Sequence, residues 1–241
     1  YIPRFVDTQD YAVSFGSQWN AFAKSQLDDQ QRTSPINDSF GYHRGTPIDR
    51  YYIKQAIDSY SEHIQGSVLE IGGREYTENC GTVDPKHSFI LNYVPIAGDN
   101  VIVGDLSDYS SLGSYHFDTF ICTQTLNFIY DFKSAIASSY ELLNPGGYFL
   151  GSVASVSNIS KYDDSRWGDY WRFTKKGIEA ALTSSKFEII DVRGFGNVLA
   201  AKAMFDGLVV EDFDQQDLLE INDSGYPVII SFLCRRPVLD E

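Results

Sequence analysis

The amino-acid sequence predicts an α/β fold with a sheet of about seven strands, mostly parallel, with helices on both faces and a terminal antiparallel hairpin. Short apolar runs alternate with helix-like segments from residue 48 to residue 192, as βαβ units do. One apolar run ends at Glu70 and leads into Gly72 and Gly73, where the backbone can turn tightly beside a ligand. A later helical segment ends at Pro145-Gly146-Gly147, directly before another apolar run, as a crossover helix does when it enters the next strand.

The first elements follow from turn residues and apolar spacing. Residues 48–64 are expected to form a helix, because Pro47 suits a first helical turn and Gly66 suits the exit. A second helix is expected at 131–143, where apolar residues recur every four positions. Apolar runs predict five strands, at residues 68–71, 89–93, 101–103, 117–123 and 148–153.

The last part of the chain predicts the edge of the sheet. A polar loop at 155–170 precedes a helix at 174–183, which Thr174 is expected to cap. Residues 187–192 and 226–234 are two further apolar runs, and the stretch 198–220 between them looks mostly helical. A pair of strands with a helical insertion between them indicates an antiparallel hairpin that closes one sheet edge.

The chain is expected to have two parts. Residues 1–47 are interpreted as an N-terminal helical lid or cover segment, in which Phe15, Trp19 and Phe22 fall on one helix face. Residues 48–241 are interpreted as the sheet domain, because no Pro-, Ser- or Gly-rich linker divides them.

Charge excludes two classes of partner. Lys and Arg total 19 against 33 Asp and Glu, which gives a formal net charge of −14. A nucleic-acid backbone requires clustered basic side chains, and an anionic membrane surface also selects for basic ones. We therefore expect neither nucleic acid nor membrane as a partner.

The cysteines and the first residue bear on cellular context. Cys80, Cys122 and Cys234 lie far apart and match no metal-binding spacing, so no metal is expected. Unpaired cysteines in apolar runs indicate a reducing, cytoplasmic setting. The sequence shows neither a signal peptide nor an apolar run of membrane-spanning length, and its start at Tyr1 without methionine suits a part of a longer polypeptide.

Four motifs occur in a fixed order along the predicted strands. They are Glu70-Ile71-Gly72, Gly104-Asp105-Leu106, Phe117-Asp118 and Leu143-Asn144-Pro145-Gly146-Gly147. Over roughly residues 40–235 this series resembles that of class I S-adenosylmethionine-dependent methyltransferases, which have a Rossmann-like sheet. The stretches 44–52, 123–126 and 167–174 are similar to a bacterial subgroup often encoded with, or fused to, glycosyltransferases of surface-polysaccharide pathways.

The resemblance implies S-adenosylmethionine as the cofactor and places it at the carboxyl ends of the strands. Glu70, Gly72 and Gly73 would contact its methionine and ribose part. Gln124, which follows the fourth strand, would flank the sulfonium side of the pocket.

The adenosine side of the predicted site departs from the family pattern. Asn92 stands where the family usually has an acid for the ribose, while Asp105 would accept from the adenine amino group and Leu106 would cover the ring. The usual Gly-x-Gly-x-Gly turn is reduced to Gly-Gly-Arg-Glu-Tyr at residues 72–76. These departures leave a second interpretation open: a degenerate module without catalysis that acts as a binding or interaction domain.

The acceptor is expected beside the loop that follows the fifth strand. Trp167, Tyr170 and Trp171 suit stacking on a sugar or a planar acceptor. The favoured function is methyl transfer to a hydroxyl of a small or carbohydrate-linked acceptor, with a glycosyltransferase as an expected pathway partner. A nicotinamide oxidoreductase is disfavoured, because its three spaced glycines and downstream acid are missing.

Two residues are nominated as the base that a hydroxyl acceptor needs, namely His43 and Asp169. Asp169 equally suits a buried structural pair with Arg172. Three arginines are candidate partners for the cofactor carboxylate, although an ordinary ion pair suits each of them better: Arg44, Arg50 and Arg74.

Overall fold

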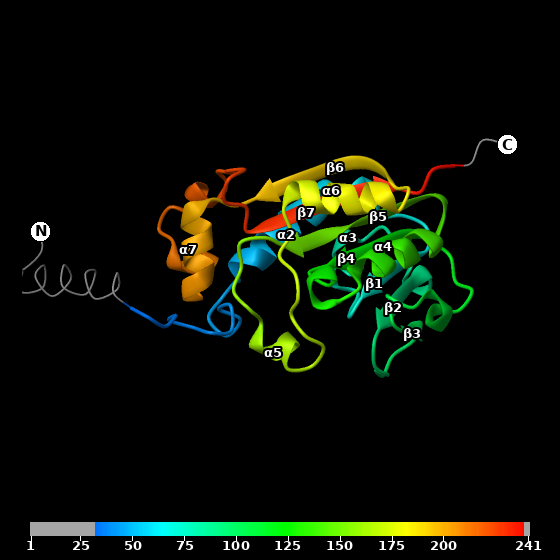
Figure 1. The fold of residues 1–241 in the computed structure, drawn as a ribbon, viewed down its shortest axis with the longest axis horizontal. Coiled ribbons are helices and arrows are strands. Elements are labelled where there is room, and N and C mark those ends of the chain that lie inside the picture. The colour runs from blue at the N-terminus through cyan, green and yellow to red at the C-terminus, as the bar shows by residue number, and fades with distance from the viewer. Residues whose placement is uncertain (1–31, 239–241) are drawn as a thin grey trace, which may run out of the picture. The chain divides into compact units, whose positions relative to one another are not determined.

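The computed structural model describes residues 32–238 and divides the chain into two compact units, Tyr1–Ile36 and Asn37–Glu241. The second unit contains a seven-stranded sheet with helices on both faces (Figure 1). The aromatic helix face expected at Phe15, Trp19 and Phe22 lies outside the described residues.

The sheet has the order β3-β2-β1-β4-β5-β7-β6. The five parallel strands are β1 (Val68–Ile71), β2 (Ser88–Asn92), β3 (Val101–Val103), β4 (Phe117–Thr123) and β5 (Leu143–Ala154). The antiparallel end consists of β7 (Ile229–Arg235), which lies between β5 and β6 (Glu188–Phe195). This topology confirms the predicted fold class. Because β1 pairs with both β2 and β4, the strand order reverses at β1, where open α/β sheets bind ligands.

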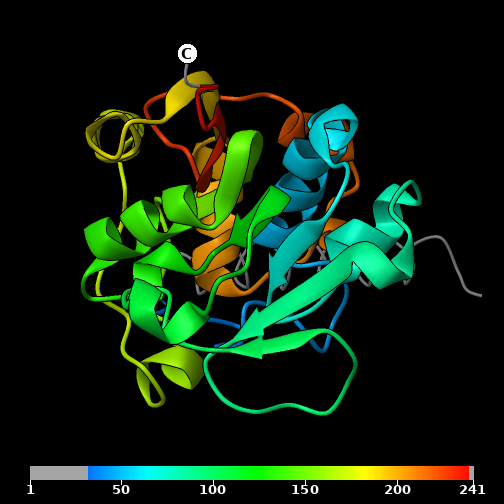
Figure 2. The same cartoon turned by 90° about the vertical axis from the view of Figure 1, so that its right-hand side faces the viewer.

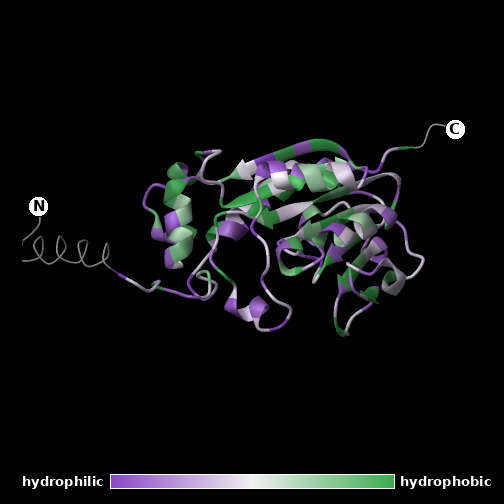
Figure 3. Cartoon of the chain, viewed as in Figure 1, coloured by the Kyte–Doolittle hydropathy of each residue, from purple (hydrophilic) through white to green (hydrophobic). Residues whose placement is uncertain are grey.

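Alternate residues of the parallel strands point to opposite faces of the sheet. Leu69, Phe120 and Phe149 lie in the core cluster that includes side chains of α4 (Phe132–Glu141) and α6 (Lys175–Ser184). Ile121 and Leu150 lie in the second cluster, with α2 (Ile48–Ser59) and α7 (Val198–Asp206). Figure 2 shows α4 and α2 on opposite sides of the sheet, and Figure 3 shows apolar residues concentrated in the strands.

Several element bounds differ from the predictions for identifiable reasons. The first helix ends at Ser59, because Ser61–His63 tighten into a 3₁₀ turn. The strand β5 begins at Leu143 rather than at 148, with a bulge against β4 at the Pro-Gly-Gly turn. Between 198 and 220 the α-helix covers only Val198–Asp206, because Gly207 ends it at φ +68°. Two short helices were not predicted, α3 (Glu75–Cys80) and α5 (Lys161–Asp164).

Residues 37–47 pack against the segment that follows α7. The amide of Val210 donates to the carbonyl of Thr46, and the side chain of Glu211 accepts from both the amide and the hydroxyl of Thr46. An isolated bridge pairs Pro47 with Val209. These contacts fix the start of α2 beside the carboxyl ends of the strands. Among residues 32–238, no helix has the length and apolar character to cross a bilayer.

Asp118 ties the amino end of β4 to its neighbours. Its Oδ2 accepts from the amide and hydroxyl of Ser67 at 2.8 and 2.9 Å, and its Oδ1 accepts from Asn144 at 2.8 Å. Burial by itself would raise the pKa of Asp118, but the hydrogen bonds from Ser67 and Asn144 outweigh it and hold the pKa below its ordinary value.

Asp118→Asn is expected to lower the free energy of unfolding by about 1 kcal/mol near neutral pH. A carboxyl with a depressed pKa stabilises the fold above its unfolded pKa, and this contribution is lost as pH falls through its folded pKa. The loss should therefore shrink as pH falls through the lowered folded pKa of Asp118, because the wild-type carboxyl then becomes protonated as well. Urea unfolding of both proteins from neutral to acid pH measures this difference, and a loss that does not change with pH would contradict it.

Candidate active site

A cavity of about 720 Å³ lies at the carboxyl ends of β1 to β4 and extends under the segment that follows β5. It is lined on the β1 to β3 side by Ile71, Gly72, Leu91, Asn92, Tyr93 and residues 104–107. Residues 123–125 and 127–131 line it after β4, and parts of residues 154–172 close the other side. Two of the four motifs, at residues 70–72 and 104–106, thus meet at this cavity, whereas Phe117-Asp118 and the Pro-Gly-Gly turn lie outside its lining.

The turn after β1 leaves room for a ligand. Gly72 has φ +78°, and its amide donates to the carbonyl of Leu91 at 3.0 Å. A Cβ built at Gly72 or at Gly73 would meet no atom within 4 Å. Gly72 lines the cavity, whereas Gly73 does not. This open cradle fits the methionine end of S-adenosylmethionine despite the shortened glycine pattern.

Glu70 faces the start of α3 and does not line the cavity. It is 3% exposed, and its carboxylate accepts from the amides of Tyr76 and Thr77 and from the hydroxyl of Thr77. Burial raises the pKa of Glu70, while these hydrogen bonds oppose the rise. The side chain therefore satisfies free amides in the first turn of α3, a role that a carboxylate fills well at a helix N-terminus.

Asn92, Asp105 and Leu106 all line the adenosine side. Asn92 donates from Nδ2 to the carbonyl of Val94 at 3.0 Å. Asp105 accepts at Oδ1 from the amide and hydroxyl of Ser107, and within the described residues its Oδ2 has no hydrogen-bond partner. Leu106 is 5% exposed. Asp105 thus keeps one oxygen for a ligand donor.

Gln124 lines the cavity in a strained backbone conformation. Its φ is +47°, which side-chain-bearing residues adopt at a cost of about 1–3 kcal/mol and mostly at functional sites. Its amide donates to the carbonyl of Ser152 at 2.8 Å, and its Nε2 donates to the hydroxyl of Ser152 at 3.3 Å. These contacts to β5 hold the conformation.

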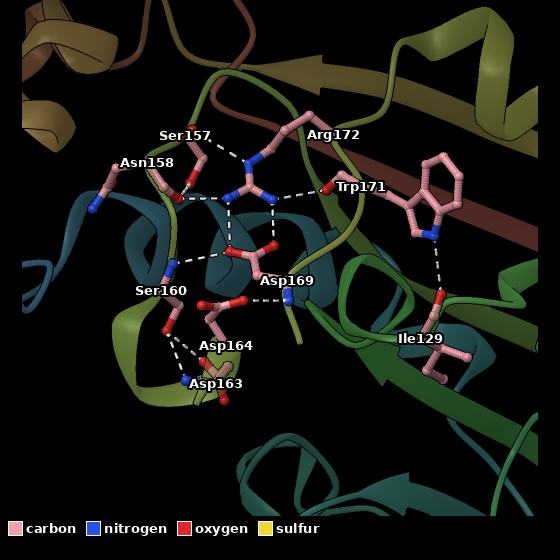
Figure 4. A network of polar contacts seen from close by, with 9 residues as sticks. All are labelled: Ile129, Ser157, Asn158, Ser160, Asp163, Asp164, Asp169, Trp171 and Arg172. Atoms are coloured by element: carbon pink, nitrogen blue, oxygen red, sulfur yellow. Dashed lines mark hydrogen bonds and ion pairs between the residues drawn. The ribbon is translucent and has the colours of Figure 1, made fainter. Parts of the chain in front are cut away.

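The segment after β5, residues 155–173, forms a closed strap, which we call the acceptor strap. Its ends meet where the amide of Phe173 donates to the carbonyl of Ala154 at 2.8 Å. Arg172 binds both oxygens of Asp169, at 2.5 and 2.8 Å, and donates to the carbonyls of Ser157 and Asn158 (Figure 4). The strap is therefore held together by an internal ion pair.

Both nominated bases are poorly placed to accept a proton. The Asp169 side chain is 1% exposed, and both of its oxygens are engaged, by Arg172 and by the amide of Ser160. Asp169 does border the cavity, whereas His43 is exposed and lies outside the lining.

The three aromatic residues of the acceptor strap lie in different surroundings. Trp167 and Tyr170 line the cavity and are 41% and 49% exposed. Trp171 does not line it. Its indole nitrogen donates to the carbonyl of Ile129 (Figure 4). Its ring packs edge-on against Phe132. Trp171 is therefore placed to anchor the strap to the loop after β4.

Only one of the three candidate arginines lines the cavity. Arg44 pairs with Asp212, and Arg74 donates to the carbonyl of Asp99. Arg50 borders the cavity and donates from Nε to the hydroxyl of Tyr42 at 2.7 Å. Of the three arginines, Arg50 is therefore the one placed to reach a ligand in the cavity.

The lining residues that were not predicted from the sequence include Tyr42, Asp49, Asn127 and Asn158. Asp49 is 8% exposed, and burial raises its pKa against the opposing charge of Arg50. In the sequence, Asp49 looks like an ordinary acid of a first helical turn. Asn127 could have been found by its place just after the fourth strand, where sheet ligands bind. Within residues 32–238 no cluster of three or more His, Cys, Asp or Glu side chains suits a metal.

Residues 67–151 match the family model described as a methyltransferase domain. A search of curated protein sequences finds no match. The fold is similar to that of the N-methyltransferase NodS of Bradyrhizobium japonicum, solved with S-adenosyl-L-homocysteine, with a TM-score of 0.52 and 17% identity over 83% of this chain and 93% of that one. A methyltransferase of Archaeoglobus fulgidus has a TM-score of 0.50 and 13% identity over 77% and 94% of the two chains.

The [4+2]-cyclase SpnF is also similar, with a TM-score of 0.52 and 16% identity over 81% of this chain and 85% of that one. These likenesses show the fold, and the family match covers β1 to β4 and the first part of β5. Residues 67–151 therefore match a methyltransferase domain, and the fold of the chain is similar to that of S-adenosylmethionine-dependent methyltransferases.

Proposed function

We propose that this domain methylates a hydroxyl group of a small or carbohydrate-linked acceptor. The observation that carries the proposal is the continuity of the cavity, which joins the turns after β1, β2 and β3 to the aromatic side chains of the acceptor strap. A methyl donor and an acceptor can therefore lie in one continuous cavity, as alignment of the reacting atoms requires.

Geometry and chemistry support the proposed cofactor side of the site. S-adenosylmethionine supplies a methyl group that is already activated by its sulfonium. The cradle at Gly72 would hold the methionine end, and Gln124 would border the sulfonium. Asn92 would bind the ribose, the free Oδ2 of Asp105 would accept from the adenine amino group, and Leu106 would cover the ring.

Calorimetric titration with S-adenosylhomocysteine tests the cofactor side. We expect one binding site per chain, and transfer of labelled methyl groups to an acceptor would then complete the proposal. A chain that folds but binds neither S-adenosylmethionine nor its demethylated product would instead be the degenerate binding module.

The carboxylates that line the cavity differ in whether both of their oxygens have hydrogen-bond or ion-pair partners. Asp131 caps α4, and Asp163 is held by Ser160 and Trp167. Asp169 is paired with Arg172. Besides Asp105, only Asp49 keeps a carboxylate oxygen without a hydrogen-bond partner among the described residues, since its Oδ1 accepts from the amide of Arg50.

We propose that Asp49 removes the acceptor proton. Burial raises the pKa of this carboxyl, which makes its deprotonated form a stronger base than an exposed aspartate. This assignment replaces His43 and Asp169, the first of which lies outside the cavity lining and the second of which has both oxygens engaged.

Asp49→Asn is expected to lower kcat about 10²- to 10⁴-fold with an unchanged Kd for S-adenosylhomocysteine. The wild-type rate should rise with pH through a pKa above that of an ordinary aspartate, because only the deprotonated carboxylate accepts a proton, and this rise should vanish in the variant. Asp58→Asn, on the exposed face of the same helix, serves as the control. A variant that loses cofactor affinity along with rate would show that Asp49 binds the cofactor instead.

The carbohydrate-linked acceptor and a functional pairing with a glycosyltransferase are proposed on the subgroup resemblance of residues 44–52, 123–126 and 167–174. In the structure these stretches supply Arg50, Gln124 and Tyr170 to the cavity. The residues that carry the resemblance thus border the space where an acceptor would lie, which supports a shared acceptor class.

A further inference from the structure

Two carboxamides line the cavity without any hydrogen bond to the described part of the chain, those of Asn127 and Asn158. Asn127 lies in the 3₁₀ turn Leu126–Phe128 that follows β4, and it is only 2% exposed. Asn158 lies on the acceptor strap. In both residues the buried Oδ1 lacks a partner. Buried amides are normally hydrogen-bonded, so a pair left unsatisfied in one cavity requires an explanation.

The main chains of both residues are anchored, although their side chains are not. The carbonyl of Asn127 accepts from the amides of Tyr170 and Trp171 at 3.0 and 3.1 Å. The carbonyl of Asn158 accepts from Arg172 at 2.6 Å, and its side chain points away from the Arg172–Asp169 pair (Figure 4). The fold therefore positions both carboxamides at the cavity without using them.

The charged residues that line the cavity are mostly acidic. On the strap, Arg172 is paired with Asp169, whereas Arg166 donates to the carbonyl of Tyr162 and has no carboxylate partner among the described residues. The lining contains five carboxylates against three guanidinium groups, namely Asp49, Asp105, Asp131, Asp163 and Asp169 against Arg50, Arg166 and Arg172. An anionic acceptor would therefore meet a net negative lining. This side of the cavity favours an uncharged ligand.

Aromatic side chains line the same cavity as the free carboxamides. Tyr130 and Tyr170 line the cavity, are 72% and 49% exposed, and meet edge to face with ring centres 5.4 Å apart. Trp167 lies in the same lining. Such rings offer flat apolar faces to a saturated ring, while a carboxamide offers both a donor and an acceptor to a hydroxyl.

We propose that Asn127 and Asn158 are the hydrogen-bonding residues of the acceptor subsite, and that this subsite takes a neutral, hydroxyl-rich ring such as a pyranoside. The inference rests on the proposed function, because it specifies the acceptor of the same site. It adds two specificity-determining residues and excludes sugar phosphates and nucleotide sugars as preferred acceptors.

Saturation-transfer NMR on the protein saturated with S-adenosylhomocysteine tests this inference. The probes are the methyl pyranosides of glucose, galactose, mannose and rhamnose, with glucose 1-phosphate and UDP-glucose as the anionic comparison. We expect at least one neutral pyranoside to bind more tightly than both anions. Asn127→Ala and Asn158→Ala should each raise its Kd about tenfold, the effect of losing one good hydrogen bond.

Asn79→Ala is the matched control, because Asn79 is exposed on α3 and outside the cavity lining. It should leave the pyranoside affinity unchanged. Asn127→Ala should also leave the melting temperature within about 2 °C of wild type, because the carboxamide holds no other part of the fold.

The outcomes separate the two proposals. If S-adenosylhomocysteine binds but no neutral pyranoside does, or if the anions bind more tightly, the inference is wrong and the methyltransferase proposal stands. Affinity unaffected by both alanine variants, or a large fall in melting temperature in Asn127→Ala, would also overturn it. Failure of S-adenosylhomocysteine to bind the folded wild type would reject the proposed function itself.

Discussion

Gly72→Val is expected to abolish binding of S-adenosylhomocysteine, raising its Kd at least about 100-fold, which corresponds to about 2.7 kcal/mol of lost affinity. The space beside Gly72 is empty in the protein, so the added methyl groups would meet no atom of the fold. They would instead occupy the cradle where the methionine end is expected. The φ of +78° adds backbone strain of about 1–3 kcal/mol for a β-branched residue. Calorimetric titration and thermal unfolding together measure both effects.

Gly81→Val separates strain from ligand exclusion. Gly81 ends α3 at φ +67°, a Cβ there would also meet open space, and it does not line the cavity. The control should show a similar loss of stability and full cofactor affinity. Equal binding by wild type and Gly72→Val would show that the cofactor does not use this turn.

Arg172→Met is expected to destabilise the protein by about 3–5 kcal/mol, because it leaves the buried Asp169 carboxylate without its counter-charge. For a domain of this size, that loss lowers the melting temperature by about 10 °C. The acceptor strap would lose its contacts to the carbonyls of Ser157 and Asn158 as well. Acceptor affinity should therefore fall, while the binding of S-adenosylhomocysteine should change little.

Two further variants separate the effect of a buried unpaired charge from that of losing an ordinary ion pair. Lys54→Met removes an exposed ion pair with Asp58 and should cost less than about 0.5 kcal/mol. The double variant Asp169→Leu with Arg172→Met should recover part of the lost stability, because it removes both charges. If Asp169→Asn lost activity with unchanged stability, a direct chemical role for Asp169 would be favoured over the structural one.

The sequence predicted local structure best where a backbone conformation favours one type of residue, as a positive φ favours glycine. The turn at Gly72 was predicted from glycine alone, and its positive φ agrees. The bounds of β1 and β4 agree with the predictions, since apolar runs between polar ends define buried parallel strands well. The start of β5 was missed, because pairing of Leu143 with Phe117 across a bulge depends on the neighbouring strand.

Side-chain roles were harder to predict than elements, because a role depends on partners that are distant along the chain. Glu70 stands in a ligand motif, but the helix α3 that it satisfies was too short to predict. Trp171 was expected to stack on an acceptor, yet the carbonyl of Ile129 and the ring of Phe132 hold it outside the cavity lining. Asn127 follows the fourth strand, but nothing in the sequence showed that its side chain would stay without a hydrogen-bond partner.

The order of apolar runs, glycine turns and helix ends by itself determined the sheet, its class and the edge at which ligands bind, because these follow from local periodicity and backbone freedom. The tertiary structure alone decided which polar groups are free for ligands. Asp169 and Arg172 neutralise each other, whereas Asn127, Asn158 and one oxygen of Asp49 stay unpaired. Whether a buried polar group has a hydrogen-bond partner depends on residues that are close in space but distant along the chain, so only the folded structure shows it.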